Sequence, residues 1–274
     1  MKREVELSKN EKHDAWKEMH QSPEFLAQKK YIMRITNDAY KLLRLAFSYS
    51  VRAYDFSSKS LSVQSTDDLA QSILACSYLI DEGLITPVKR ELRYIIESSI
   101  KYLYADQQTS GLSLDDKVIF LENLGSSIDV RHNLKLSALH ADDAKQFIDE
   151  LNDVYRECCA YVHVSPRQVA ERLEQKERGG ALGYETTDEL RKLSKLMFRV
   201  YDMALALYFH GYDISMTGDL FAGALDDMPK WSFHKGKYVS TVSAYFDYKH
   251  ERNMRKYGES RSWNHEGRPP RKLG

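Results

Sequence analysis

Cysteine, proline and glycine are all scarce in this sequence of 274 residues, which contains 3, 6 and 13 of them respectively. Three cysteines cannot form a disulfide framework, and Cys158 and Cys159 are sequence neighbours, where a disulfide is geometrically strained. We therefore expect a reducing environment. The few prolines and glycines leave few points at which a helix would be broken, which is typical of a mainly helical protein.

Long apolar runs are also missing. No stretch approaches the roughly 18 consecutive apolar residues of a membrane-spanning helix. The opening residues, MKREVELSKNEKHDAW, lack the apolar core of a signal peptide. The hydrophobic content of 42% is nevertheless sufficient for a buried core. We expect a soluble, cytoplasmic protein that does not enter a membrane.

Motifs for nucleotide, hydrolase or metal chemistry are absent as well. The sequence has no glycine-rich P-loop, no dinucleotide fingerprint and no nucleophile elbow. Its nine histidines form no H-E-x-x-H motif, and the cysteines form no Cys-x-x-Cys motif. We therefore expect neither a metal site nor a cofactor.

The chain carries no net charge, because 40 Lys and Arg balance 40 Asp and Glu. This balance argues against a histone-like nucleic-acid coat and a polybasic membrane binder. The distribution is uneven, however: residues 228–274 contain 11 basic and 4 acidic side chains, a surplus of +7. We divide the chain into an N-terminal arm (1–26), a helical domain (27–227) and a basic aromatic extension (228–274) whose end we expect to be disordered.

Apolar residues recur at spacings of three and four, which predicts amphipathic helices and an all-α fold. The predicted helices span residues 27–54, 66–83, 86–106, 113–125, 141–163, 166–178 and 187–211. The buried stripe of the third is predicted to be Val88, Leu92, Ile95, Ile96, Ser99 and Leu103. The pattern is lost beyond residue 227, and residues 237–248 could form a strand or a helix. We expect the core to rest on helices that end before Gly211.

The segment YRECCAYVHVSP, residues 155–166, carries the strongest chemical signal. On an ideal helix one narrow arc, the expected buried seam, contains Ile148, Leu151, Tyr155, Cys158 and Val162. A second row, about 110° round on the flank of the helix, contains Asn152, Arg156, Cys159 and His163. Arg156 and His163 are two turns and about 10 Å apart, so their side chains could converge on one phosphate.

The pairing of Arg156 with His163 fits metal-free phosphodiester cleavage. Such cleavage requires a permanent cation and a group that titrates near neutrality. His163 ends its predicted helix, where unpaired carbonyls favour the imidazolium and would raise its pKa. The same positions also fit a structural role, with His163 neutralising a helix end and Arg156 solvated. Cys158 and Cys159 are more typical of core packing than of reactive thiols, since no lysine lies beside them.

The segment LAQSILACSYLIDEGLITPVKRELRYIIESSIKYLYAD (69–106) together with YRECCAYVHVSP is similar to the paired-helix pattern of HEPN proteins (higher eukaryotes and prokaryotes nucleotide-binding). The resemblance covers about residues 69–211. The family signature is an arginine followed, after four to six residues, by a histidine, and six residues separate Arg156 from His163. The resemblance implies an antiparallel helical bundle. The N-terminal arm, which we expect to be helical, and the basic, partly irregular C-terminal tail lie outside it.

The resemblance also implies metal-independent RNA cleavage. His163 would handle protons at the 2′-hydroxyl and the leaving group, and Arg156 would stabilise the transition-state charge, in sites that usually form across a homodimer. Glu157 departs from the pattern, because active members often carry an uncharged polar residue there and a carboxylate would repel the phosphate. Two hypotheses stay open: an endoribonuclease or RNA-binding protein of phage defence or of a toxin–antitoxin pair, and a catalytically inactive helical protein-interaction module.

Two further groups of residues are candidates for supporting roles. Arg93 and Glu97 are four residues apart on one helix and could orient Arg156 or His163, or could form an ordinary ion pair. Asn152, which lies in the same row as Arg156 and His163, is a further candidate for a supporting role. In the extension, the predicted RNA-binding cations are Lys235, Lys237, Lys249, Arg252, Arg255 and Lys256. They alternate with aromatic rings, a pattern that fits either RNA contact or a segment wrapped over the bundle.

Overall fold

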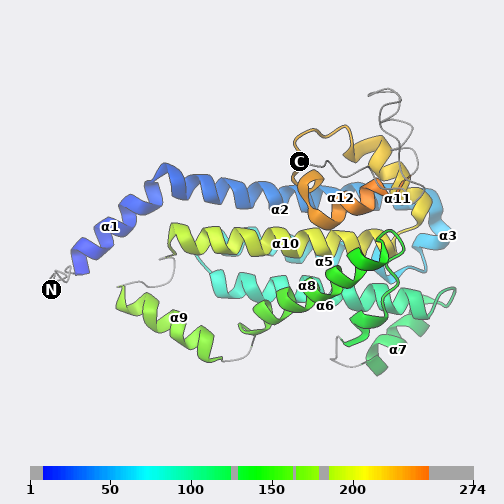
Figure 1. Cartoon of the computed structure of the whole chain (residues 1–274), viewed down its shortest axis with the longest axis horizontal. Helices are drawn as coiled ribbons and strands as arrows, with labels where there is room; N and C mark the ends of the chain where they lie inside the picture. The colour runs from blue at the N-terminus through cyan, green and yellow to red at the C-terminus, as the bar shows by residue number, and fades with distance from the viewer. Residues whose placement is uncertain (1–8, 125–128, 163–164, 179–184, 247–274) are drawn as a thin grey trace.

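The computed structural model describes residues 9–124, 129–162, 165–178 and 185–246, which are helical apart from their connections (Figure 1). The structure is 83% helix, and no strand occurs in the described ranges, which confirms the predicted all-α class. The α-helices are α1 Lys9–Gln21, α2 Pro23–Ser50, α3 Tyr54–Ser57, α4 Leu61–Gln64, α5 Thr66–Asp81, α6 Ile85–Gln108, α7 Leu114–Leu124, α8 Ala141–Cys159, α9 Pro166–Glu177, α10 Thr187–Gly211, α11 Ile214–Leu220 and α12 Lys237–Ala244. The shorter turns are η1 Val51–Ala53, η2 Asp129–Asn133, the π-helical η3 Phe221–Leu225, and η4 Ser232–Lys235. None of the described helices is long and apolar enough to cross a membrane.

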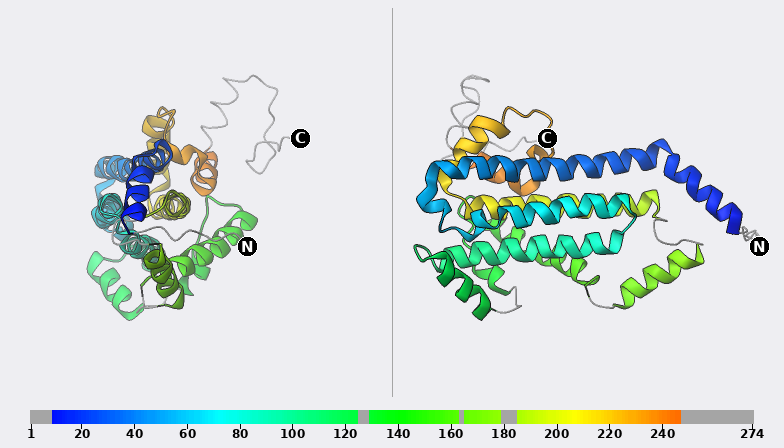
Figure 2. Two further views of the ribbon diagram at one scale, coloured as in Figure 1. Left: turned by 90° about the vertical axis from the view of Figure 1, so that its left-hand side faces the viewer. Right: turned by 180° about the vertical axis from the view of Figure 1, so that it is seen from behind.

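Helix α10 is the centre of the bundle and packs against α2, α6, α8 and α12 (Figure 2). Every residue from Val200 to Phe209 is buried, because other helices cover α10 on all sides there. Its start is fixed by a capping box, in which the Thr186 hydroxyl accepts the Glu189 backbone N–H and the Glu189 carboxylate accepts the Thr186 N–H. The predicted start at residue 187 is therefore confirmed.

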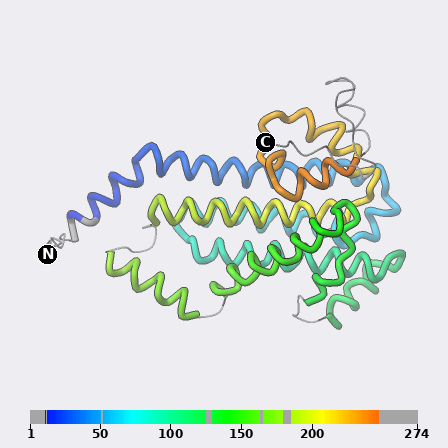
Figure 3. The backbone as a smooth tube through the Cα atoms, in the orientation of Figure 1, coloured from blue at the N-terminus to red at the C-terminus, as the bar shows by residue number. Residues whose placement is uncertain are grey.

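Helices α5 and α6 form a hairpin against α2 and α10, and Figure 3 shows the path of the chain through it. Gly83 supplies the positive φ of 68° that the tight connection requires. All six side chains of the predicted α6 stripe are buried. The helix begins at Ile85, one residue before its predicted start, so Thr86 lies inside its first turn.

The seam of α8 differs in part from its prediction. Leu151 and Cys158 are buried as expected, while Phe147 and Val154 complete the buried face and Ile148 is only half-buried. The helix ends at Cys159, four residues earlier than predicted. The backbone amides of Tyr161 and Val162 then bond three residues back in a tighter turn, to the carbonyls of Cys158 and Cys159.

The core continues well beyond Gly211, contrary to expectation. Residues 237–244 form helix α12, which settles the alternative between strand and helix. Trp231, Phe233 and Tyr238 are buried in the same hydrophobic core as α10. The described part of the extension, through Phe246, therefore packs on the bundle, and these three rings are not exposed for base stacking.

Two aspartates on the long helices hold this C-terminal segment. The Asp202 carboxylate accepts the backbone N–H groups of Tyr238 and Val239, at 2.9 and 3.0 Å, at the start of α12. The Asp38 carboxylate accepts the backbone N–H of Ser232 at 2.8 Å at the start of η4. Each carboxylate thus satisfies amides that a helix start leaves unpaired.

Replacing Asp202 by alanine should unfold α12 from the bundle and lower the free energy of unfolding by about 2–4 kcal/mol, because buried amides lose charged acceptors. Chemical denaturation measures the loss. Asp219→Ala, at an exposed position, is the control and should stay within about 0.5 kcal/mol. Equal stability of the two variants would contradict the role assigned to Asp202.

His210 fixes the loop before α8 to α10. Its Nδ1 lies 2.7 Å from the Ala206 carbonyl oxygen, and its Nε2 accepts the Ala138 backbone N–H at 3.2 Å. Burial lowers the pKa of His210 below the usual 6.5, although the Ala206 carbonyl opposes this shift. The imidazole is therefore neutral in the folded protein near neutral pH.

Acidification below about pH 6.5 should lower the free energy of unfolding, because the unfolded chain takes up a proton at residue 210 before the folded chain does. Urea denaturation at a series of pH values measures this slope. The non-titrating variant His210→Gln should show a smaller slope over the same range. Identical slopes in both proteins would argue against a neutral, buried His210.

Candidate functional site

The C-terminal half of α8 places part of the predicted row beside α6. Arg156 is exposed in the last turn of α8, and Asn152 and Cys159 are half-buried on the flank. Helix α6 contacts α8 directly, so its side chains adjoin this flank. His163 lies outside the described residues.

Arg93 and Glu97 form an ion pair on α6, with 3.0 Å between Nη2 and Oε2. Lys101 adds a second cation, 2.7 Å from the other Glu97 oxygen. Arg93 also reaches α8, where its Nη2 donates to the Tyr155 hydroxyl at 3.1 Å. Among the described interactions Arg93 therefore positions Tyr155, whereas the sequence hypothesis had it orient Arg156.

Cys159 lies beside Arg93 and Tyr155, and its side chain interacts with both. Burial raises the pKa of Tyr155, and the neighbouring Cys159 adds to the shift. Cys158 points into the core, where burial raises the pKa of its thiol to about 12. The packing role predicted for both cysteines holds for Cys158, while Cys159 has a cation beside it that the local sequence could not show.

Side chains of α6 and α9 hold the turn that follows α8. Arg90 Nε donates to the Tyr161 carbonyl at 2.7 Å, and the Tyr161 hydroxyl donates to Glu171 at 2.6 Å. The Lys89 ammonium lies 3.7 Å from the centre of the Tyr161 ring. Burial opposes ionisation of Glu171, yet the Tyr161 hydroxyl and the Lys89 charge together lower its pKa. The sequence analysis missed Lys89 and Arg90, although the basic cluster VKRELR is visible in α6.

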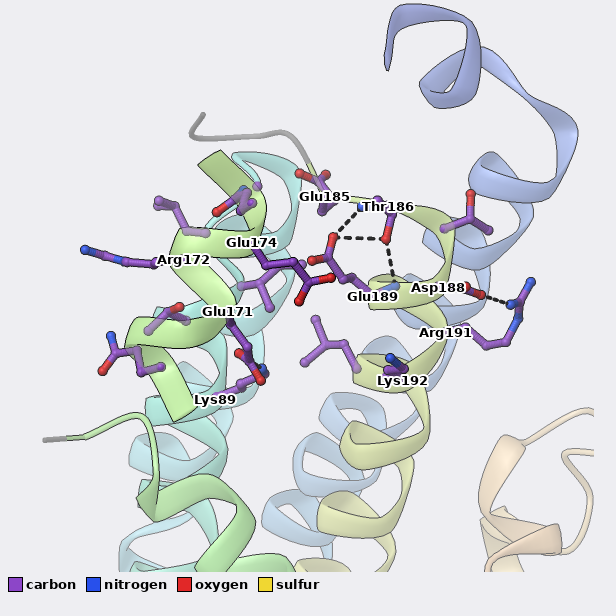
Figure 4. A pocket seen from close by; sticks show the side chains of 18 of the residues that line it. Lys89, Glu171, Arg172, Glu174, Glu185, Thr186, Asp188, Glu189, Arg191 and Lys192 are labelled. Atoms are coloured by element: carbon purple, nitrogen blue, oxygen red, sulfur yellow. Dashed lines mark hydrogen bonds and ion pairs between the residues drawn. The ribbon is translucent and has the colours of Figure 1, made fainter. Parts of the chain in front are cut away.

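A polar cavity of about 970 Å³ lies between α9, the start of α10 and the start of α6. Figure 4 shows Glu174 and Glu189 pointing toward each other across it. The side chain of Glu185 is buried there, and burial raises its pKa. Acidic and basic side chains both line the cavity, and no group of metal-ligating residues occurs in the described part of the chain.

Of the three thiols, only Cys159 should react with a disulfide reagent in the folded protein, because Cys76 and Cys158 are fully buried. Thiol titration should count one group per native chain and three per unfolded chain. A fast-reacting thiol that survives in Cys159→Ser would contradict the assignment.

No family model matches the chain, and neither a curated protein nor a solved structure shows significant similarity to it.

Proposed function

We propose that the chain binds RNA at the face formed by α6 and the C-terminal half of α8, and cleaves it without a metal ion through Arg156 and His163. The observation that supports this most directly is the state of Arg156. It is exposed and has no ion-pair partner in the described residues, whereas the nearby cations Arg93 and Arg199 pair with Glu97 and Glu157. Arg156 is therefore a cation of this face that is available to contact a phosphate.

The position of Glu157 weakens the objection drawn from its charge. On the helix it lies about 100° from Arg156, and its carboxylate is 3.8 Å from the Arg199 guanidinium of α10. The pairing with this cation of α10 partly neutralises the carboxylate. A phosphate bound by Arg156 would therefore meet less repulsion than the sequence alone suggested.

In the proposed reaction His163 takes the proton of the ribose 2′-hydroxyl, whose oxygen attacks the adjacent phosphorus. The protonated His163 then gives its proton to the departing 5′-oxygen, and the RNA strand is left with a 2′,3′-cyclic phosphate. Arg156 stabilises the negative charge that grows on the phosphoryl oxygens. Arg156 lies on the outward side of α8, so a second copy of the chain could add its own pair across a shared cleft, as the resemblance implies.

RNA cleavage should persist in excess EDTA and fall at least about 100-fold in Arg156→Ala and in His163→Ala. Incubation of purified protein with structured and unstructured RNA, resolved on gels, measures both effects. Lys195→Ala, which removes an exposed cation of α10 outside this face, is the control and should cleave normally. Loss of activity on chelation, or full activity in both site variants, would refute the proposal.

The catalytically inactive interaction module is favoured by a different observation on α9. Val169 and Leu173 are four residues apart and expose 43% and 55% of their surface, so the larger apolar side chains of this helix face solvent. Two such side chains on one helix face suit contact with a protein partner, such as an antitoxin. A chain that cleaves no RNA, and that is unfolded by His163→Ala, would support this function instead.

A further inference from the structure

The outer face of α2 carries a row of cations that the α8 site does not use. Lys30, Arg34, Lys41 and Arg44 are all exposed, and Arg52 is exposed just beyond the helix in η1. At 100° per residue the four cations of α2 fall within an arc of about 80°. They form one straight stripe, which we call the α2 row.

The α2 row points directly away from the core. The buried residues of α2 are centred about 180° from it, among them Ile32, Ile35, Ala39, Leu42 and Ala46. Figure 2 shows α2 on the outside of the bundle, with α10 between α2 and α8. The α2 row and the Arg156 face therefore lie on different sides of the molecule.

Negative charge within the protein does not neutralise this row. Neither the four cations of the α2 row nor Arg52 has an ion-pair partner among the residues the structure describes. Lys29, beside them, pairs with Asp81. The two acidic side chains of α2 are engaged elsewhere. Glu24 pairs with Arg191, and Asp38 accepts hydrogen bonds from Ser232. A chain with no net charge thus keeps one helix face purely cationic.

Like charges three and four residues apart on a helix repel each other, so this spacing does not serve helix stability.

Aromatic rings accompany the row. The Arg34 guanidinium lies 5.3 Å from the centre of the Tyr31 ring, and that of Arg52 lies 4.5 Å from the Tyr49 ring. Phe47 is 49% exposed near the end of the helix. Exposed cations with aromatic rings beside them are what binding of a nucleic-acid strand uses.

We propose that the α2 row binds the phosphate backbone of a single-stranded RNA lying along α2. From Lys30 to Arg44 the row extends about 21 Å, long enough to meet several successive phosphates. A membrane surface fits less well, because a helix that lies on a membrane inserts its apolar face, and that face of α2 is buried in the core. The proposal shares its ligand with the proposed function but uses another surface.

Reversing two charges in Lys41→Glu/Arg44→Glu should weaken binding of a short labelled RNA at least about tenfold. Each lost phosphate contact should also reduce the salt dependence of the binding constant by about 0.7 in slope. Fluorescence anisotropy at several salt concentrations measures both, with a 2′-O-methyl RNA that lacks the attacking 2′-hydroxyl and so stays intact. The control, Lys176→Glu/Lys195→Glu, makes the same change in net charge at exposed positions of α9 and α10 and should bind almost normally. Both double variants should melt within a few degrees of the parent.

Equal weakening in the two double variants would show that only net charge matters and would overturn the proposal, as would unchanged binding in both. Binding of phosphatidylserine vesicles that depends on Lys41 and Arg44, without RNA binding, would overturn it in favour of a membrane. Duplex DNA as a further probe should bind more weakly than single-stranded RNA; tighter binding of the duplex would overturn the choice of a single strand. The effect of Lys41→Glu/Arg44→Glu on binding should be the same in an Arg156→Ala background, whereas cleavage is lost through Arg156 alone, so failure of the cleavage proposal leaves a distinct result from failure of this one.

Discussion

The contact between the Asp202 carboxylate and the first amides of α12 is the constraint on which the closed bundle depends. Helix α10 is buried on all sides over its central turns, and α12 with the preceding turn supplies one of those sides. Burial raises the pKa of Asp202 to about 6, while the amides of Tyr238 and Val239 favour its charged form. The close approach also limits Gly236, since a Cβ there would lie 2.1 Å from the Asp202 oxygen. One carboxylate thus joins segments 36 residues apart in sequence.

Asp106 repeats the arrangement at the other short helices. Its carboxylate accepts the backbone N–H groups of Leu61 and Ser62 at the start of α4, both at 2.9 Å. It also accepts the Lys117 ammonium at 2.7 Å, and Lys117 is the buried residue of α7. Helices of four to eleven residues are marginal in isolation, because nucleation costs more than a few hydrogen bonds return. Aspartates of the long helices, such as Asp106 and Asp202, cap the short helices and remove part of that cost.

Local pattern was sufficient to predict the long helices but not what holds the short ones. The α6 stripe and the start of α10 followed from apolar spacing and from Thr186 and Glu189, which are close in sequence. Helix α12 could not be predicted in the same way, because its cap is contributed by α10. The environment of Cys159 was hidden for the same reason, since Arg93 approaches it from another helix. The α2 row, in contrast, is visible in the sequence as cations with helical spacing. A comparison of the net charges of whole segments does not reveal it, because acidic residues elsewhere in the segment cancel its charge.

The two surfaces proposed to meet RNA differ in what their chemistry permits. The α2 row offers four or more permanent cations and no group that titrates near neutrality, so it can hold phosphates but cannot transfer protons. The flank of α8 offers one unpaired arginine and, by sequence, an imidazole, which suits proton transfer but gives little affinity on its own. Because α10 lies between the two helices, a straight strand cannot touch both faces of one copy. A strand held by the α2 row would therefore have to bend around the bundle, or pass to a second copy of the chain, before it reached Arg156.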